Sequence, residues 1–214
     1  MARRLLPLSG AVSVGLIVLG IGWLGGTDTP GSKDSAAKIS AFYLPHHTRQ
    51  SLAAVVLCVA AGFLVGFAAS FWSAGEIRSP WRLLFVLGAT VEATGLLAAA
   101  SIHLALSEGV HDGVAPAAVQ ALNALDNNDY LPFLIGVALM MAGAAGSLIP
   151  MHGAERMLGW TALVLALAMV TFTPAAFFGF LASGVWVIAA SIVLTLRAWE
   201  ERRTDGVSAQ AVTA

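Results

Sequence analysis

The chain has 214 residues, of which 58% are hydrophobic and only 11% are charged, and its formal net charge is −1. A soluble domain carries about 25% charged residues, so this composition excludes an ordinary soluble fold. It also lacks the basic clusters that bind nucleic acid. The single cysteine, Cys58, excludes an intramolecular disulfide and a cysteine-based metal site, which leaves it a small packing role. The composition therefore predicts an integral membrane protein whose first partner is the lipid bilayer.

Six apolar runs follow one another along the chain, and most approach the length needed to cross a bilayer. The expected spans are residues 8–24, 52–72, 83–106, 131–149, 157–173 and 179–197. The first run could also be a signal peptide, but no Ala-x-Ala cleavage pattern follows it, so we favour a membrane helix. We expect an all-α fold, a bundle of six transmembrane helices in one domain over residues 1–199, followed by a disordered tail at 200–214.

Two loops read as short amphipathic helices on one side of the membrane. The first runs from about Ser35 to Tyr43, lies on the membrane surface and is expected to end at Pro45. The second starts at Pro116, a favoured first-turn residue, and ends near the Asx-rich run at 126–129. That run is typical of a helix stop and a turn, with recognition of a cation or a sugar as the alternative.

The basic residues sort unevenly between the two sides of such a six-span arrangement. Cytoplasmic loops collect Lys and Arg. One side receives Lys33, Lys38 and Arg49, and the other receives Arg3, Arg4, Arg78, Arg82, Arg156, Arg197, Arg202 and Arg203. The imbalance predicts a multi-pass protein of the cell membrane with both termini in the cytoplasm.

The third span contains one acid, Glu92, near its middle. A helix turns by about 100° per residue, which places Gly88, Glu92, Gly95 and His103 on one face. An ionised carboxylate facing lipid costs several kcal/mol, so we expect this face to point into the bundle. His103 lies about 16 Å from Glu92 along the helix, too far for a direct hydrogen bond.

Buried acids within a membrane often bind protons or substrates, so Glu92 and His103 form the first candidate site for a proton or a ligand. The resulting hypothesis is a small proton-linked transporter or sensor. The alternative is a non-catalytic scaffold or subunit, in which Glu92 fixes helix packing against a membrane-protein partner or a second copy. No motif aligns the two halves of the chain, which counts against a carrier built from repeats.

A second polar cluster is expected at the boundary where His103 lies. Its members are His46, His47, Glu108, His111 and Asp112. Imidazoles and carboxylates together bind divalent metals, and paired histidines bind haem, so a metal- or haem-dependent membrane enzyme is a third hypothesis. The spacing fits no closed metal motif, and no catalytic motif occurs anywhere in the chain. The sequence therefore predicts no catalytic residue and no cofactor.

Three stretches resemble a group of uncharacterised six-helix membrane proteins that is common in actinobacteria. They are SAAKISAFYLPHHTRQ before the second span, VQALNALDNN before the fourth, and RMLGWTALVLAL at the start of the fifth. The resemblance covers about residues 35–198, and Phe42-Tyr43 stands where that group frequently has two tyrosines. It implies a six-helix fold, and it implies no activity and no functional residue.

Overall fold

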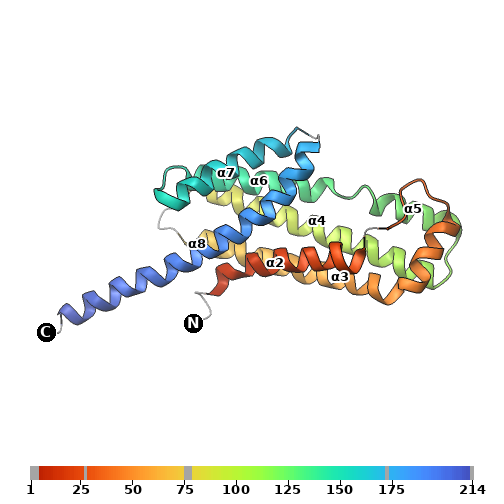
Figure 1. The fold of residues 1–214 in the computed structure, drawn as a ribbon, viewed down its shortest axis with the longest axis horizontal. Coiled ribbons are helices and arrows are strands. Elements are labelled where there is room, and N and C mark those ends of the chain that lie inside the picture. Colours follow the sequence, from red (N-terminus) through yellow and green to blue (C-terminus); the bar gives the residue numbers. More distant parts are fainter. Residues whose placement is uncertain (1–4, 27, 75–78, 172–173, 213–214) are drawn as a thin grey trace.

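The computed structural model describes residues 5–26, 28–74, 79–171 and 174–212, with side chains described up to Glu200 except at 174 and 175. Within these residues helices are the only regular elements. In chain order they are η1 (Leu6–Leu8), α2 (Ser9–Ile17), η2 (Val18–Gly25), α3 (Ala36–Ser73), α4 (Pro80–His111), α5 (Pro116–Asp126), α6 (Leu131–Leu148), α7 (Gly153–Met169) and α8 (Pro174–Val212). Figure 1 shows them as an elongated bundle with α5 near one end and both chain termini toward the other.

The first apolar run forms a continuous helical segment with three geometries. A 3₁₀ turn at η1 leads into α2, and η2 is a π-helix that stops at Gly26. Gly26 has a φ of +80°, a backbone conformation open to glycine because it has no Cβ. The chain therefore leaves this helix by a turn that runs toward α5.

The prediction that a separate surface helix ends at Pro45 is wrong. Helix α3 continues through Pro45 and extends over 38 residues, bending near its start (Figure 1). Tertiary contacts hold the bent turn in place, because Ile39 and Tyr43 are 0% and 1% exposed under α5 rather than spread on a membrane surface. Burial against Val119 of α5 thus overrides the local preference of proline to end a helix.

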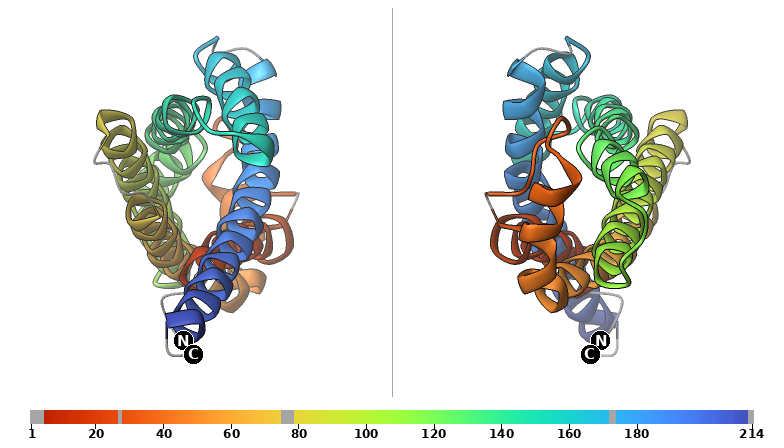
Figure 2. Two further views of the ribbon diagram at one scale, coloured as in Figure 1. Left: turned by 90° about the vertical axis from the view of Figure 1, so that its left-hand side faces the viewer. Right: turned by 90° about the vertical axis from the view of Figure 1, so that its right-hand side faces the viewer.

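Helix α6 lies between α4 and α7, as the view along the bundle in Figure 2 shows. Glycines bring α4 and α6 unusually close. A Cβ added at Gly88 would lie 2.7 Å from the Cα of Met140, and one added at Gly143 would lie 2.7 Å from the Cα of Phe85. Such contacts between backbones are the usual means of helix association in membranes, where apolar surface alone gives no driving force.

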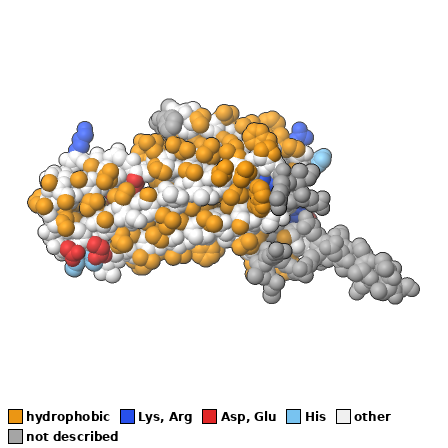
Figure 3. Space-filling view, turned by 180° about the vertical axis from the view of Figure 1, so that it is seen from behind, with side chains coloured by type: hydrophobic (Ala, Val, Ile, Leu, Met, Phe, Trp, Pro, Cys, Tyr) orange, Lys and Arg blue, Asp and Glu red, His pale blue; other side chains and the backbone are white. Residues whose placement is uncertain are grey.

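Five helical segments in the described residues are long and apolar enough to cross a membrane. They are Leu6–Gly25, Ala36–Ser73, Pro80–His111, Pro116–Leu148 and Ala176–Glu200. Figure 3 shows apolar side chains covering the long middle of the visible face, while charged and histidine side chains gather toward the ends. The chain is therefore an all-helical protein with the surface of a membrane protein. The sequence suggests that Cys58 has a packing role, but its side chain is exposed on the apolar surface.

Two predicted features lie partly outside the described residues. The turn expected between the fifth and sixth spans includes residues 172–173, and Arg3, Arg4 and Arg78 belong to segments outside the described part of the chain. Helix α8 runs from Pro174 to Val212 and so includes most of the segment 200–214, for which a disordered tail stays a prediction.

Candidate functional site

Glu92 lies on the stretch of α4 that packs closely against α6. It is 6% exposed, and its Oε2 has no hydrogen-bond partner among the described residues. A Cβ added at Gly136 of α6 would lie 2.6 Å from the Cα of Glu92. Gly88 and Gly95 are buried as well, so the predicted stripe faces the interior of the bundle. The acid is thus enclosed at a tight helix crossing.

His103 lies further along α4, at the end of the bundle that carries α5, which we call the α5 end. Its Nδ1 is 3.1 Å from each carboxylate oxygen of Asp126, the last residue of α5. Its Nε2 is 2.8 Å from Oε1 of Gln50 on α3. The three side chains come from three helices and are all largely buried, with Gln50 at 0% exposure. His103 therefore ties α3, α4 and α5 together.

Hydrogen-bond polarity defines the protonation state that this arrangement suits. Nε2 of Gln50 donates to the carbonyl oxygen of Gly25 at 3.0 Å, and a carbonyl can only accept. Oε1 of Gln50 must then accept from Nε2 of His103. The Asp126 carboxylate likewise accepts, from Nδ1. With an ionised Asp126, both ring nitrogens meet acceptors, so the two contacts are complete together only for the doubly protonated imidazolium.

Further side chains extend this network to the segment before α3. The Tyr43 hydroxyl donates to Asp126 Oδ2 at 3.4 Å, and its ring lies edge-on to His103. Nδ2 of Asn123 donates to the Gly31 carbonyl at 2.9 Å, and Nδ2 of Asn127 donates to the Pro30 carbonyl at 3.1 Å. Helix α5 is thus held by its acid on one side and by its amides on the other.

The predicted polar cluster is only partly assembled. His47 and His111 stack with ring centroids 4.2 Å apart, and Nε2 of His47 lies 3.0 Å from Oε2 of Glu108 at ion-pair distance without hydrogen-bond geometry. The hydroxyl of Ser51 donates to the other oxygen of Glu108 at 2.8 Å. His46 takes no part in this group, because its Nδ1 donates to the carbonyl oxygen of Phe42.

The metal site and the haem site suggested by the sequence can be compared with these side-chain positions. Among the described residues there is no group of three or more His, Cys, Asp or Glu side chains arranged to hold a metal ion. Both nitrogens of His103 are already engaged, so a haem iron could bind there only after one contact is broken. Within the described part of the chain, no hydrogen bond or ion pair joins the Asp112 side chain to the cluster.

Sequence reasoning found His103 but missed its partners. No sequence pattern singles out Gln50, and Asp126 belongs to the Asx-rich run that predicts a helix stop and a turn. The signal available was weak: an acid in a loop without Lys or Arg, on the same side of the membrane as a histidine within a span. The neighbouring Asn127 and Asn128 do form turn contacts, with side-chain amides donating to backbone carbonyls four residues earlier.

Comparison with protein-family models, with curated proteins and with solved structures finds no match to this chain.

Proposed function

We propose that this chain is a proton-responsive integral membrane protein in which His103 is the proton-binding group. The observation that carries the proposal is that the two ring nitrogens of His103 face two acceptors, Gln50 and Asp126. Imidazole is the side chain whose charge changes between about pH 5 and pH 8. Loss of the proton leaves one nitrogen lone pair facing an oxygen, and one of the two contacts must break.

Whichever contact breaks, the neutral ring no longer forms an ion pair with Asp126, the last residue of α5. Gln50 is anchored at its other end by Gly25, whereas Asp126 sits at the last turn of a helix of only 11 residues. A hydrogen bond to a charged group contributes about 1.5–3 kcal/mol, which is a large fraction of what a short helix needs to stay docked. Deprotonation is therefore expected to loosen α5 from α3 and α4.

Hydrogen exchange of the α5 amides tests this expectation in purified protein. Protection factors of α5, corrected for intrinsic exchange, should fall between about pH 6 and about pH 8. Asp126→Asn, which keeps the shape and removes the charge, should lower protection at the acidic pH to the level that the unaltered protein has at the alkaline pH. Asp112→Asn is the matched control, because that acid lies at the same end of the bundle. Protection of α5 that is independent of pH in the unaltered protein would refute the proposal.

Glu92 separates a transporter from a sensor or scaffold. A transporter needs water to reach this acid, whereas the close approach of Gly136 favours a dry packing site. The test is Glu92→Cys in a Cys58→Ser background, probed in intact membranes with a charged thiol reagent from each side. Labelling would make Glu92 a second proton site of a transporter. Absence of labelling in a folded protein would restrict proton sensing to His103 and give Glu92 a structural role.

The arrangement in the membrane is part of the proposal. We infer that α7, with 17 residues and a length of about 25 Å, is a sixth span packed between α6 and α8. The charge imbalance then favours both termini in the cytoplasm and the α5 end on the outer side of the cell membrane. The resemblance to uncharacterised six-helix proteins of actinobacteria stays a prediction.

A further inference from the structure

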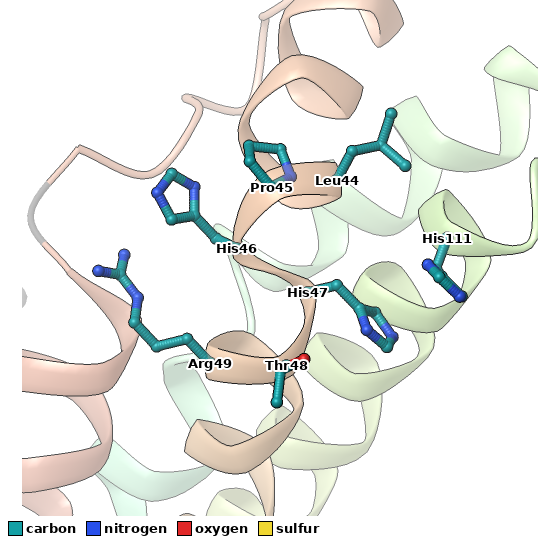
Figure 4. Close-up of a pocket in the computed structure, with 7 residues that line it drawn as sticks. All are labelled: Leu44, Pro45, His46, His47, Thr48, Arg49 and His111. Carbon is teal, nitrogen blue, oxygen red and sulfur yellow. The ribbon is translucent and has the colours of Figure 1, made fainter.

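A separate polar depression lies on the bent part of α3, beside the end of α4. It has a volume of about 450 Å³ and is open to the surroundings. Five of the seven residues that line it have polar or charged side chains: His46, His47, Thr48, Arg49 and His111. Figure 4 shows His46 and Arg49 directed to one side of α3, and His47 directed toward His111 of α4. The proposed proton response uses none of these residues.

We propose that this depression binds a phosphate group. Arg49 is exposed, and no carboxylate among the described residues pairs with it. Its guanidinium presents a planar fork of donors that matches two phosphate oxygens. The Thr48 hydroxyl is a further donor at the same bend. Together they provide one permanent charge and one neutral contact for an oxyanion.

The orientation of the His46 ring adds a donor that depends on pH. Its Nδ1 donates to the Phe42 carbonyl at 2.7 Å, so Nδ1 carries a hydrogen in every state that keeps this bond. Protonation therefore adds a hydrogen at Nε2, an atom that forms no hydrogen bond with any described residue. His46 becomes a charged donor at the depression only when it takes up this proton.

The overall charge of the region changes sign with the imidazoles. Arg49 and the three histidines carry four positive charges when the rings are protonated, while the nearby Glu108 and Asp112 carry two negative charges, a balance of +2. With neutral rings the balance is one positive charge against two negative charges, or −1. Because the region changes from +2 to −1, phosphate should bind more tightly at mildly acidic pH than at alkaline pH, although the phosphate group itself gains negative charge over the same range.

The position along α3 agrees with a phosphate at the membrane surface. After Arg49, the next exposed apolar side chains on α3 are Leu52, Val55 and Val59, each about half exposed. Arg49 thus lies about one helical turn before this row of apolar side chains on α3. A lipid headgroup and a free phosphate both offer the required group at that level.

Titration of purified protein in an uncharged detergent with inorganic phosphate tests the site. We expect saturable binding at about pH 6 that weakens at least tenfold at about pH 8. Arg49→Gln should weaken binding at the acidic pH about tenfold or more, because a contact with a charged group is lost. Arg156→Gln is the matched control, since it removes an exposed arginine outside the depression and should leave binding unchanged.

Nanodiscs distinguish the two sources of the phosphate group. If the ligand is a lipid, the protein should retain phosphatidic acid over phosphatidylcholine at about pH 6 in native mass spectrometry, and Arg49→Gln should abolish the preference. Binding of inorganic phosphate without this preference indicates a free phosphate ligand. Failure of both probes, or equal losses in Arg49→Gln and Arg156→Gln, would overturn the proposal. The α5 exchange experiment does not depend on this outcome.

Discussion

The contact between α4 and α6 at Glu92 allows a quantitative test of the fold. Gly136→Ala places a Cβ against backbone atoms of Glu92, one of them only 2.6 Å away, and backbone cannot rotate aside as a side chain can. Gly62→Ala is the matched control, because it is also a glycine inside a long helix but a Cβ there meets nothing within 4 Å.

Both substitutions gain about 0.5–1 kcal/mol from the better helix propensity of alanine, so that gain cancels between them. What remains is the cost of overpacking at Gly136, which we place near the upper end of the usual range, at about 3 kcal/mol. Gly136→Ala should therefore be less stable than Gly62→Ala by about that amount.

Unfolding in mixed micelles with increasing SDS, followed by circular dichroism, measures this difference. The unaltered protein should lie between the two variants, slightly below Gly62→Ala. If Gly136→Ala matched Gly62→Ala in stability, α4 and α6 would not approach each other as closely as the structure shows, and the enclosure of Glu92 would be refuted.

Two further predictions follow from single contacts. The side chain of Asp34 is hydrogen-bonded to Lys38 and to the Gly31 amide, which lowers the pKa of this carboxyl. The ionised carboxylate should therefore stabilise the turn before α3 fully above the ordinary carboxyl pKa of about 4, and this stabilisation should be lost as the pH falls through the lower pKa of the folded protein. Carboxyl NMR titration would show the lowered pKa, and Lys38→Met should bring it closer to the ordinary value. Nε1 of Trp186 donates to the Leu158 carbonyl at 2.8 Å and the residue is 4% exposed, so Trp186→Phe should cost about 1–3 kcal/mol in the same SDS titration, from the lost hydrogen bond and the smaller ring. An Asp34 carboxyl that titrates at the ordinary value, or a Trp186→Phe variant of unaltered stability, would contradict the respective contact.

The class of the protein and the orientation of its central helix follow from the amino-acid sequence alone. Apolar runs long enough to cross a bilayer can become little other than membrane helices, because unpaired backbone groups are too costly in lipid. The same cost places Glu92 and its neighbouring glycines inside the bundle, as found. These conclusions need only local composition and helical periodicity, and they hold whatever the helices pack against.

The partners of His103 and the course of the chain at Pro45 depend on how the helices pack against one another. Gln50 and Asp126 lie 53 and 23 residues away from His103, and no local pattern encodes such contacts. Helix α3 passes through Pro45 because Ile39 and Tyr43 are buried beneath α5, and that burial stabilises a bend which proline alone disfavours. The candidate site arises where three helices meet, and helical periodicity reports which residues share a face of one helix but not which other helix that face contacts.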